Sequence, residues 1–172
     1  MLIIFGGLPG SGKTTVARAL AKRLGAVHLR VDTIEQAIRA SGDLERDIGP
    51  AGYVVAYGVA QDNLTLGRLV VADSVNPLEI TRNAWLAVAA RSAAIAVEVE
   101  VICSDKTEHR RRVETRKTDV EGLVKPTWQE VVDRVYEDWG QRPIVVDTAA
   151  KSVEEAVDGL VAKLGIDRPH SI

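Results

Sequence analysis

The sequence contains little cysteine and no long apolar run. Cys103 is its one cysteine, which excludes an intrachain disulfide and a cysteine-rich zinc site. A membrane-spanning helix needs about 18 consecutive apolar residues, and no segment approaches that length. The first residues, Met1–Phe5, lack the basic region and the cleavage site of a secretory signal. We therefore expect a cytoplasmic protein of a reducing compartment, with no membrane partner.

A strong excess of charge of either sign is also missing. The formal net charge of −2 gives no general attraction for nucleic acid, so an extended nucleic-acid partner is not expected. No internal repeat, low-complexity tract or linker interrupts the chain, and its 172 residues are enough for one full α/β core. We therefore expect a single domain over residues 1–172. The oligomeric state does not follow from the sequence.

Five short apolar runs alternate with segments of helical periodicity. The predicted strands are Leu2–Phe5, Val27–Val31, Arg68–Asp73, Val97–Cys103 and Ile144–Asp147. These runs are continuously apolar rather than alternating, which is typical of strands buried on both faces. Strands that alternate with helices pair in parallel through right-handed crossovers. The pattern therefore predicts an α/β fold with a parallel sheet.

Start and stop signals place the helices between these strands. The predicted starts are Asp32, Asn76 with Pro77 at the first helical position, Asp105, Thr127 with Glu130, and Ser152 with Glu155. Gly25 is the predicted stop of the first helix. Residues 41–50 are predicted to form a loop before a helix over 52–66, and the helix that starts at Thr127 is expected to carry Trp139.

The segment Gly7–Thr14 matches the phosphate-loop pattern G-x-x-x-x-G-K-[ST] in full, between a predicted strand and a predicted helix. Its glycines let backbone N–H groups turn toward phosphate oxygens, and the following helix adds its positive N-terminal end. Lys13 would neutralise charge on the β- and γ-phosphates, and the Thr14 hydroxyl would bind Mg²⁺. The predicted nucleotide-binding residues of this motif are Gly7, Leu8, Pro9, Gly10, Ser11, Gly12, Lys13, Thr14 and Thr15. The motif predicts ATP and Mg²⁺ as cofactors.

Two aspartates end predicted strands near this loop. Ligands of parallel sheets bind beyond the carboxyl ends of the strands, where Asp32 and Asp73 are expected. Asp32 could accept the proton of an attacking hydroxyl or orient that hydroxyl, although it is also a good helix cap. Asp73 ends a Walker-B-like run and could hold the Mg²⁺ shell, with a simple turn as the alternative.

The one dense basic cluster lies on a predicted helix that leads into residues 113–126. Arg112 and Arg116 share a helix face and could cover the phosphates as part of a lid, with Arg116 supplying charge during transfer. For Arg110 and Arg111 a solvated face is favoured. Asp147 follows the last strand, where backbone contacts could grip an adenine; a plain turn is the alternative.

In order along the chain, Gly7–Thr14, Leu29–Asp32, Val70–Asp73 and Arg112-x-x-x-Arg116 resemble P-loop small-molecule kinases of the nucleoside-monophosphate-kinase-like group. The similarity is greatest to the branch with chloramphenicol phosphotransferase, gluconate kinase and shikimate kinase, which includes AAA_33-type ATP-binding proteins. This resemblance implies a three-layer fold with a five-stranded sheet of order 2-3-1-4-5 and a lid over about 113–126.

The same resemblance implies that Asp32 activates the acceptor hydroxyl, that Arg112 lies near the adenine or the phosphates, and that Arg116 contacts the phosphates. It also implies that the acceptor binds to residues 33–66. The substrate motifs of shikimate kinase and adenylate kinase are missing. The Ala, Val, Gly and Tyr content of residues 41–66 suits a partly apolar small molecule.

The leading hypothesis is therefore ATP-dependent phosphorylation of a hydroxyl on a small molecule. A nucleoside, nucleotide or polynucleotide 5′-hydroxyl kinase is the second reading. The third is an ATP-binding regulatory module with little turnover, because the phosphate loop alone serves all three. A motor function of the AAA+ type is not expected, since the chain has no room for an additional helical domain.

Overall fold

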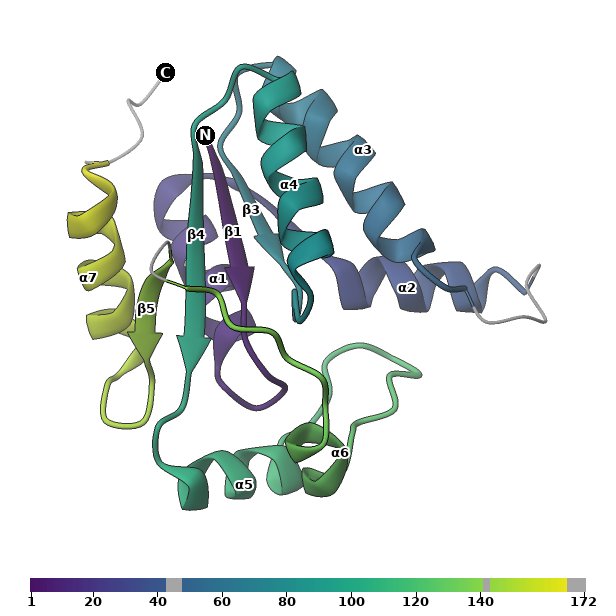
Figure 1. The fold of residues 1–172 in the computed structure, drawn as a ribbon, viewed down its shortest axis with the longest axis vertical. Coiled ribbons are helices and arrows are strands. Elements are labelled where there is room, and N and C mark those ends of the chain that lie inside the picture. The colour runs from purple at the N-terminus through teal and green to yellow at the C-terminus, as the bar shows by residue number, and fades with distance from the viewer. Residues whose placement is uncertain (43–47, 141–142, 167–172) are drawn as a thin grey trace.

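A computed structural model describes residues 1–42, 48–140 and 143–166. Five parallel strands form one sheet in the order β2-β3-β1-β4-β5, which is the order that the family resemblance implied. The strands are β1 (Leu2–Gly6), β2 (Val27–Arg30), β3 (Val70–Asp73), β4 (Ala96–Ile102) and β5 (Ile144–Asp147). Their carboxyl ends meet at one edge of the sheet, where α5 and α6 lie (Figure 1).

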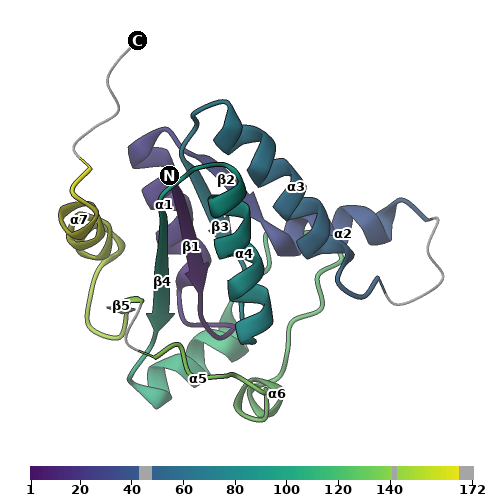
Figure 2. The ribbon, with the colours of Figure 1, turned by 45° about the horizontal axis from the view of Figure 1, so that its top comes forward.

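Helices cover both faces of the sheet. They are α1 (Lys13–Leu24), α2 (Val31–Ala40), α3 (Ala51–Thr65), α4 (Glu79–Arg91), α5 (Lys106–Thr115), α6 (Trp128–Val132) and α7 (Val153–Leu164). Helices α1 and α7 pack on one face, and α3 and α4 on the other (Figures 1 and 2). Among the described residues, no helix combines the length and the apolar character needed to cross a bilayer.

The central strand explains why the apolar runs are continuous. Ile3 and Phe5 pack with the residues of α1 and α7, whereas Leu2 and Ile4 pack with those of α3 and α4. Successive side chains of a strand point to opposite faces, and here both faces are buried. All four of these residues are fully buried.

Several predicted helix signals are confirmed. Gly25 is the left-handed C-cap of α1. Asp105 caps α5 by accepting hydrogen bonds from the backbone N–H groups of Thr107 and Glu108. Thr127 and Ser152 each form the predicted capping box, with Glu130 and Glu155 respectively. The predicted loop over 41–50 lies partly outside the described residues.

Two predictions of helix bounds were wrong. Asn76 is not the cap of α4, which starts at Glu79 after Leu78; Asn76 is fully buried and its side-chain amide donates to the Phe5 carbonyl at 2.8 Å. Helix α6 ends at Val132 and does not carry Trp139. The segment before Trp139 instead lies beside the start of α4. The backbone N–H of Glu137 donates to the carbonyl of Pro77, two residues before that helix, at 2.8 Å.

Candidate active site

The phosphate loop connects β1 to α1 at the carboxyl edge of the sheet. Gly10 and Gly12 have φ values of 85° and 93°, which favour glycine. A Cβ atom on Gly10 would lie 2.5 Å from a Val113 methyl group, so helix α5 packs closely against the loop. Lys13 begins α1 and is 6% exposed. This backbone could hold an anion at the N-terminus of the helix.

A histidine and the predicted metal ligands meet beside this loop. The Thr14 hydroxyl donates to one Asp73 carboxylate oxygen at 3.2 Å, and the His28 Nε2 lies 3.2 Å from the other. Burial raises the pKa of Asp73, but the His28 hydrogen bond, the Lys13 charge and the Thr14 hydroxyl together hold it below its usual value. The carboxylate therefore remains ionised.

A hydroxyl and a carboxylate are the kind of oxygen donors that Mg²⁺ takes from a phosphotransferase, with phosphate and water oxygens completing the shell. Thr14 and Asp73 fit this description. No group of three or more His, Cys, Asp and Glu side chains forms a metal cluster within the described ranges. The arrangement thus suits a cation shared with a bound phosphate better than one held by protein ligands alone.

Two cavities open on either side of the phosphate loop. One is called the nucleotide-side cavity after the ligand that the phosphate-loop motif predicts; it has a volume of about 540 Å³ and is lined by Gly10, Gly12, Thr14, Thr15 and Arg112 among others. The other is called the acceptor-side cavity after the acceptor region expected over residues 33–66; it has a volume of about 660 Å³ and is lined by Pro9, Asp32, Tyr53 and Leu123 among others. Lys13 and Arg116 line both cavities, so these two cations lie where the cavities meet.

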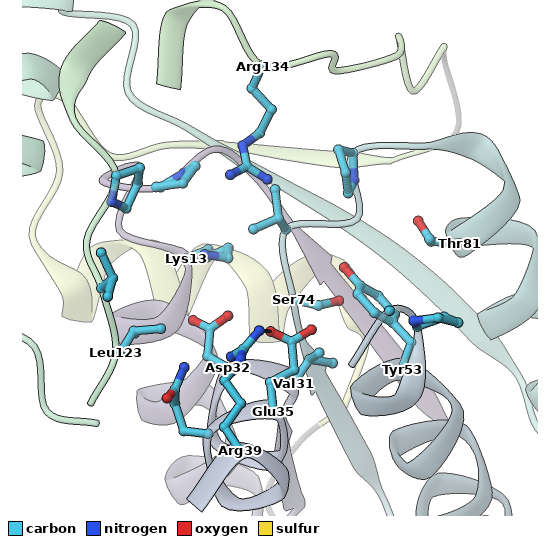
Figure 3. A pocket seen from close by; sticks show the side chains of 18 of the residues that line it. Lys13, Val31, Asp32, Glu35, Arg39, Tyr53, Ser74, Thr81, Leu123 and Arg134 are labelled. Atoms are coloured by element: carbon cyan, nitrogen blue, oxygen red, sulfur yellow. Dashed lines mark ion pairs between the residues drawn. The ribbon is translucent and has the colours of Figure 1, made fainter. Parts of the chain in front are cut away.

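Asp32 lies in the first turn of α2 rather than at the cap. The N-cap residue is Arg30, and no side chain caps this helix, so the capping alternative for Asp32 is wrong. One Asp32 oxygen lies 3.7 Å from Arg30 Nη2. Figure 3 shows Asp32 and Glu35 on one side of the acceptor-side cavity and Arg134 on the other.

Arg116 is the C-cap of α5, and its Nε is buried without a hydrogen-bond partner among the described residues. Burial lowers the pKa of Arg116, the nearby Asp32 raises it, and the Arg30 charge lowers it further. A guanidinium with an unused buried N–H can accept an anionic partner such as a phosphate oxygen.

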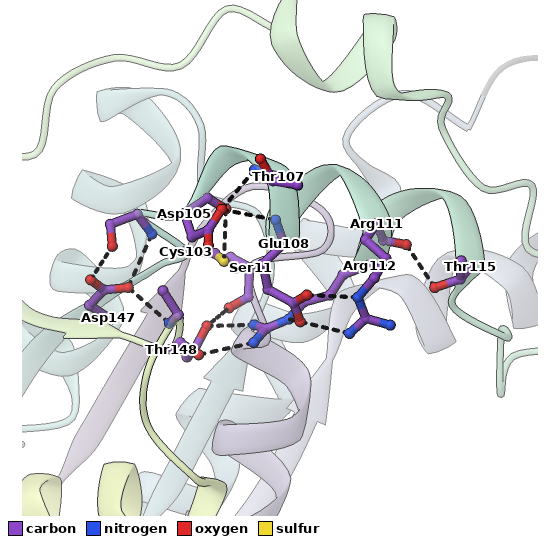
Figure 4. Close-up of polar contacts among 12 residues, drawn as sticks. Ser11, Cys103, Asp105, Thr107, Glu108, Arg111, Arg112, Thr115, Asp147 and Thr148 are labelled. Atoms are coloured by element: carbon purple, nitrogen blue, oxygen red, sulfur yellow. Dashed lines mark hydrogen bonds and ion pairs between the residues drawn. The ribbon is translucent and has the colours of Figure 1, made fainter.

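Arg112 connects α5 to the loop after β5 (Figure 4). It donates to the Thr148 hydroxyl at 2.8 Å and to the Thr148 carbonyl at 3.0 Å, and the Thr148 hydroxyl donates to the Ser11 carbonyl at 2.7 Å. Asp147 instead accepts from the hydroxyl of Ser104 at 2.5 Å and from the backbone N–H of Ala149 at 3.0 Å. Arg112 lines the nucleotide-side cavity, and Asp147 lines neither cavity.

The remaining basic residues of α5 are surface residues. Arg110 pairs with Glu114 and Arg111 with Glu108, each at 2.8 or 2.7 Å, and both arginine side chains are at least 60% exposed. The predicted solvated face is confirmed for these two arginines. The other members of the phosphate loop differ in position: Pro9 lines the acceptor-side cavity, whereas Leu8 and Ser11 line a small cavity of about 110 Å³ behind the loop.

Several site residues were missed by the sequence analysis. They are Arg18, His28, Arg30, Tyr53, His109, Asp119, Arg134 and Thr148. His28 lies on a strand and contacts Asp73. The Nε2 atom of His109 lies 2.9 Å from the Pro9 carbonyl of the phosphate loop. The sequence could have indicated Arg30 only by its position at the end of a predicted strand, and that position does not predict which residue Arg30 contacts.

A parallel sheet of this order with a phosphate loop after its central strand defines a kinase-like P-loop nucleotide-binding fold. The chain belongs to the AAA_33 family of AAA domains, which matches residues 2–149.

Several known proteins are similar to the chain in sequence or in fold. A protein of Thermococcus onnurineus (strain NA1) called "Putative adenylate kinase" is 28% identical over 168 residues, which cover 95% of this chain and 84% of the relative. The APS kinase CysC of Mycobacterium tuberculosis, solved with AMPPNP and APS, has a TM-score of 0.73 at 21% identity and covers 96% and 97% of the two chains. The gluconokinase of Sinorhizobium meliloti 1021 has a TM-score of 0.65 at 21% identity, covering 95% and 90%.

Proposed function

We propose that this protein is an ATP-dependent phosphotransferase that moves the γ-phosphate of ATP to a hydroxyl of a small molecule. The observation that carries the proposal is the position of Lys13 and Arg116, which line both cavities. A nucleotide on one side and an acceptor on the other would meet at these two cations. Charge that develops on a transferring phosphoryl group is stabilised by such fixed cations.

Each neighbouring side chain has a role in this reaction. The acceptor hydroxyl oxygen forms the new bond to the γ-phosphorus while the bond to the β-bridging oxygen breaks, and Asp32 takes the hydroxyl proton. Lys13 and Arg116 hold the phosphate oxygens. Thr14 and Asp73 would hold Mg²⁺, which neutralises phosphate charge when bound. Arg112 would lie along the nucleotide.

The acceptor-side cavity supports a partly apolar acceptor. Its polar lining includes Lys13, Asp32 and Ser74, whereas its less polar lining includes Tyr53 and Leu123. The apolar lining also contains Val31, Pro50, Val75, Pro77, Leu78, Val124 and Pro126. Ligand sites of this kind bury an apolar body and orient it with a few polar groups. Residues 33–66 contribute Glu35, Gln36, Arg39, Gly49, Pro50 and Tyr53 to this lining.

Nucleotide binding is tested first. Lys13→Ala should remove most of the thermal stabilisation that a non-hydrolysable ATP analogue with Mg²⁺ gives to the wild type, because the loop loses its phosphate cation. Lys163→Ala, which removes the same charge from the last turn of α7, should leave the stabilisation unchanged. An equal ligand-induced shift in Lys13→Ala would contradict the role given to Lys13.

Phosphate transfer is tested with a metabolite extract. The protein is incubated with ATP·Mg²⁺ and a cell extract, and mass spectrometry follows the appearance of a phosphate ester. Asp32→Asn should lower its formation by about 100-fold or more, in line with the usual contribution of a general base. Binding of nucleotide without any new ester would favour the regulatory module instead.

A nucleotide acceptor is the second candidate, because Arg39 and Arg134 line the acceptor-side cavity and a relative carries an adenylate kinase name. The test compares several acceptors: adenosine, AMP, a single-stranded oligonucleotide with a 5′-hydroxyl, and small apolar alcohols. A product formed only from the nucleoside, the nucleotide or the oligonucleotide would replace the leading proposal by this one.

A further inference from the structure

The lid carries a carboxylate that contacts the body of the protein at two points. Asp119 accepts a hydrogen bond from Arg30 Nη1 at 2.7 Å, and its second oxygen accepts one from Arg18 Nη2. Arg18 lies on α1 and Arg30 ends β2, so one lid side chain joins three parts of the chain. Figure 2 shows the segment after α5 running toward α2, which follows β2 directly.

The surroundings of Asp119 are strongly cationic. Seven lysines and arginines line the nucleotide-side cavity: Lys13, Arg18, Lys22, Arg30, Arg112, Arg116 and Lys117. Among the described residues that line it, Asp119 is the one acid. The hydrogen bonds from Arg18 and then Arg30 hold the pKa of Asp119 far below its usual value, so the carboxylate is ionised throughout the neutral range.

These contacts differ from an ordinary surface ion pair. An isolated exposed pair contributes about 0 to 1 kcal/mol. Here two guanidinium groups share one carboxylate. The Arg30 side chain is 12% exposed, whereas those of Arg18 and Asp119 are 57% and 50% exposed, so the Arg30 contact is the less screened of the two. Holding Arg30 in place also costs little further side-chain entropy, because its surroundings already restrict it. The contact can therefore fix the position of the lid.

We propose that Asp119 is a latch that holds the lid closed over the nucleotide-side cavity and thereby slows the exchange of nucleotide. This inference rests on the part of the proposed function that places ATP in this cavity. Arg18 and Arg30 line the cavity itself, so the lid closes onto its wall rather than onto a remote surface. Glu121 lies two residues away in the same lid, is exposed, and makes none of the described polar contacts.

Lid opening is measured without any ligand. Backbone hydrogen exchange of residues 113–126 is followed by mass spectrometry in the wild type, Asp119→Asn and the matched control Glu121→Gln. We expect exchange to be about fivefold faster in Asp119→Asn, because two charge-assisted hydrogen bonds are weakened, and unchanged in Glu121→Gln. Arg18→Gln should act in the same direction, with a smaller change. Equal exchange in all variants would overturn the latch.

Nucleotide release is measured with a fluorescent ADP analogue. Its dissociation should be about fivefold faster from Asp119→Asn than from Glu121→Gln. Raising KCl from about 0.1 M to about 1 M shortens the screening length from about 10 Å to about 3 Å. Release from the wild type should then accelerate more than release from Asp119→Asn. The same dissociation rate in both variants would contradict the proposal.

The two measurements separate the latch from the proposed function. If no variant binds the analogue while lid exchange still rises in Asp119→Asn, nucleotide binding is wrong and the effect of the latch on nucleotide exchange fails with it. If the analogue binds, and neither the lid exchange rate nor the nucleotide dissociation rate changes in Asp119→Asn, the proposed function stands and the latch is wrong.

Discussion

At the scale of single residues, Asp73 depends on two neighbours of different kinds. Thr14 and His28 each contact one of its carboxylate oxygens at 3.2 Å, and the Asp73 side chain is 1% exposed. Thr14 belongs to the phosphate loop, whereas His28 lies on the edge strand β2. Second-neighbour contacts of this type orient metal ligands in many proteins. In the proposed site, His28 would position Asp73 and would contribute no atom to the cation.

Replacing His28 should change the need for Mg²⁺. In His28→Ala we expect the Mg²⁺ concentration for half-maximal binding of a fluorescent ATP analogue to rise by about tenfold, since Asp73 loses its orienting partner. His28→Gln, which can still donate an N–H, should restore most of the wild-type value. A loss of similar size in both variants would show that His28 only fills space.

At the scale of elements, the sequence predicted what is local. The capping boxes at Thr127 and Ser152 need only residues three apart, and both formed as expected. Asn76 was assigned by the same logic and failed, because its side chain is bonded to Phe5, 71 positions away. The helix expected to reach Trp139 also ended early. The residues expected to form its last turns contact α4 instead, and no local sequence pattern predicts those contacts.

Arg82 on α4 makes those contacts. It is 1% exposed, donates to the carbonyls of Asn76 and Asp138 at 3.2 Å and 3.0 Å, and lies 4.9 Å from the centre of the Trp139 ring. A buried arginine that bonds several carbonyls joins the loop after β3 to the segment after α6.

Removing this guanidinium should destabilise the whole domain. We expect Arg82→Met to lower the free energy of unfolding by about 3 kcal/mol, because several buried carbonyls lose their donor. The melting temperature, measured by calorimetry, should then fall by about 9 °C. Arg91→Met, at the exposed end of the same helix, should change it by no more than about 2 °C. Equal melting curves for the two variants would contradict the role of Arg82.

Arg116, the C-cap of α5, can be tested by substitution. Arg116→Ala should lower the turnover number by about 100-fold while nucleotide affinity falls by less than about fivefold, since charge from the lid matters most during transfer. Steady-state kinetics with the acceptor from the extract screen, together with binding of the ATP analogue, separates the two effects. Arg110→Ala, an exposed residue of the same helix, is the control. Wild-type turnover in Arg116→Ala would remove Arg116 from the mechanism.

At the scale of the whole molecule, the sheet order followed from the resemblance to P-loop small-molecule kinases. The parallel sheet and the phosphate loop were predictable from contiguous patterns in the sequence. The contacts that complete the site were not. Asp119 reaches Arg30 and Arg18 across 89 and 101 positions, and no spacing rule relates a lid aspartate to the end of β2. No role for Asp119 was predicted from the sequence. Only the folded chain brings this carboxylate to the wall of the nucleotide-side cavity.

Arg30 lies between two carboxylates, Asp119 at 2.7 Å and Asp32 at 3.7 Å. In the proposed reaction, Asp119 would hold Arg30 away from Asp32 while the lid is closed, and Asp32 would stay available for the acceptor hydroxyl. With the lid open, Arg30 would be free to pair with Asp32 and would compete with the acceptor hydroxyl for its carboxylate oxygens. Lid closure and proton acceptance would be coupled through this one side chain.

This coupling predicts that a second substitution, Arg30→Gln, raises the turnover of Asp119→Asn instead of lowering it further. Asp119→Asn should lower turnover by about tenfold, as expected for impaired proton transfer. Adding Arg30→Gln to Asp119→Asn should restore part of that rate, because the cation that competes for Asp32 is gone. The matched comparison is Arg30→Gln in the Glu121→Gln background, where no gain is expected. Turnover is measured as phosphate ester formed from the identified acceptor. Losses that simply add would show that Arg30 supports the fold without linking the lid to Asp32, because residues that act through one another deviate from additivity.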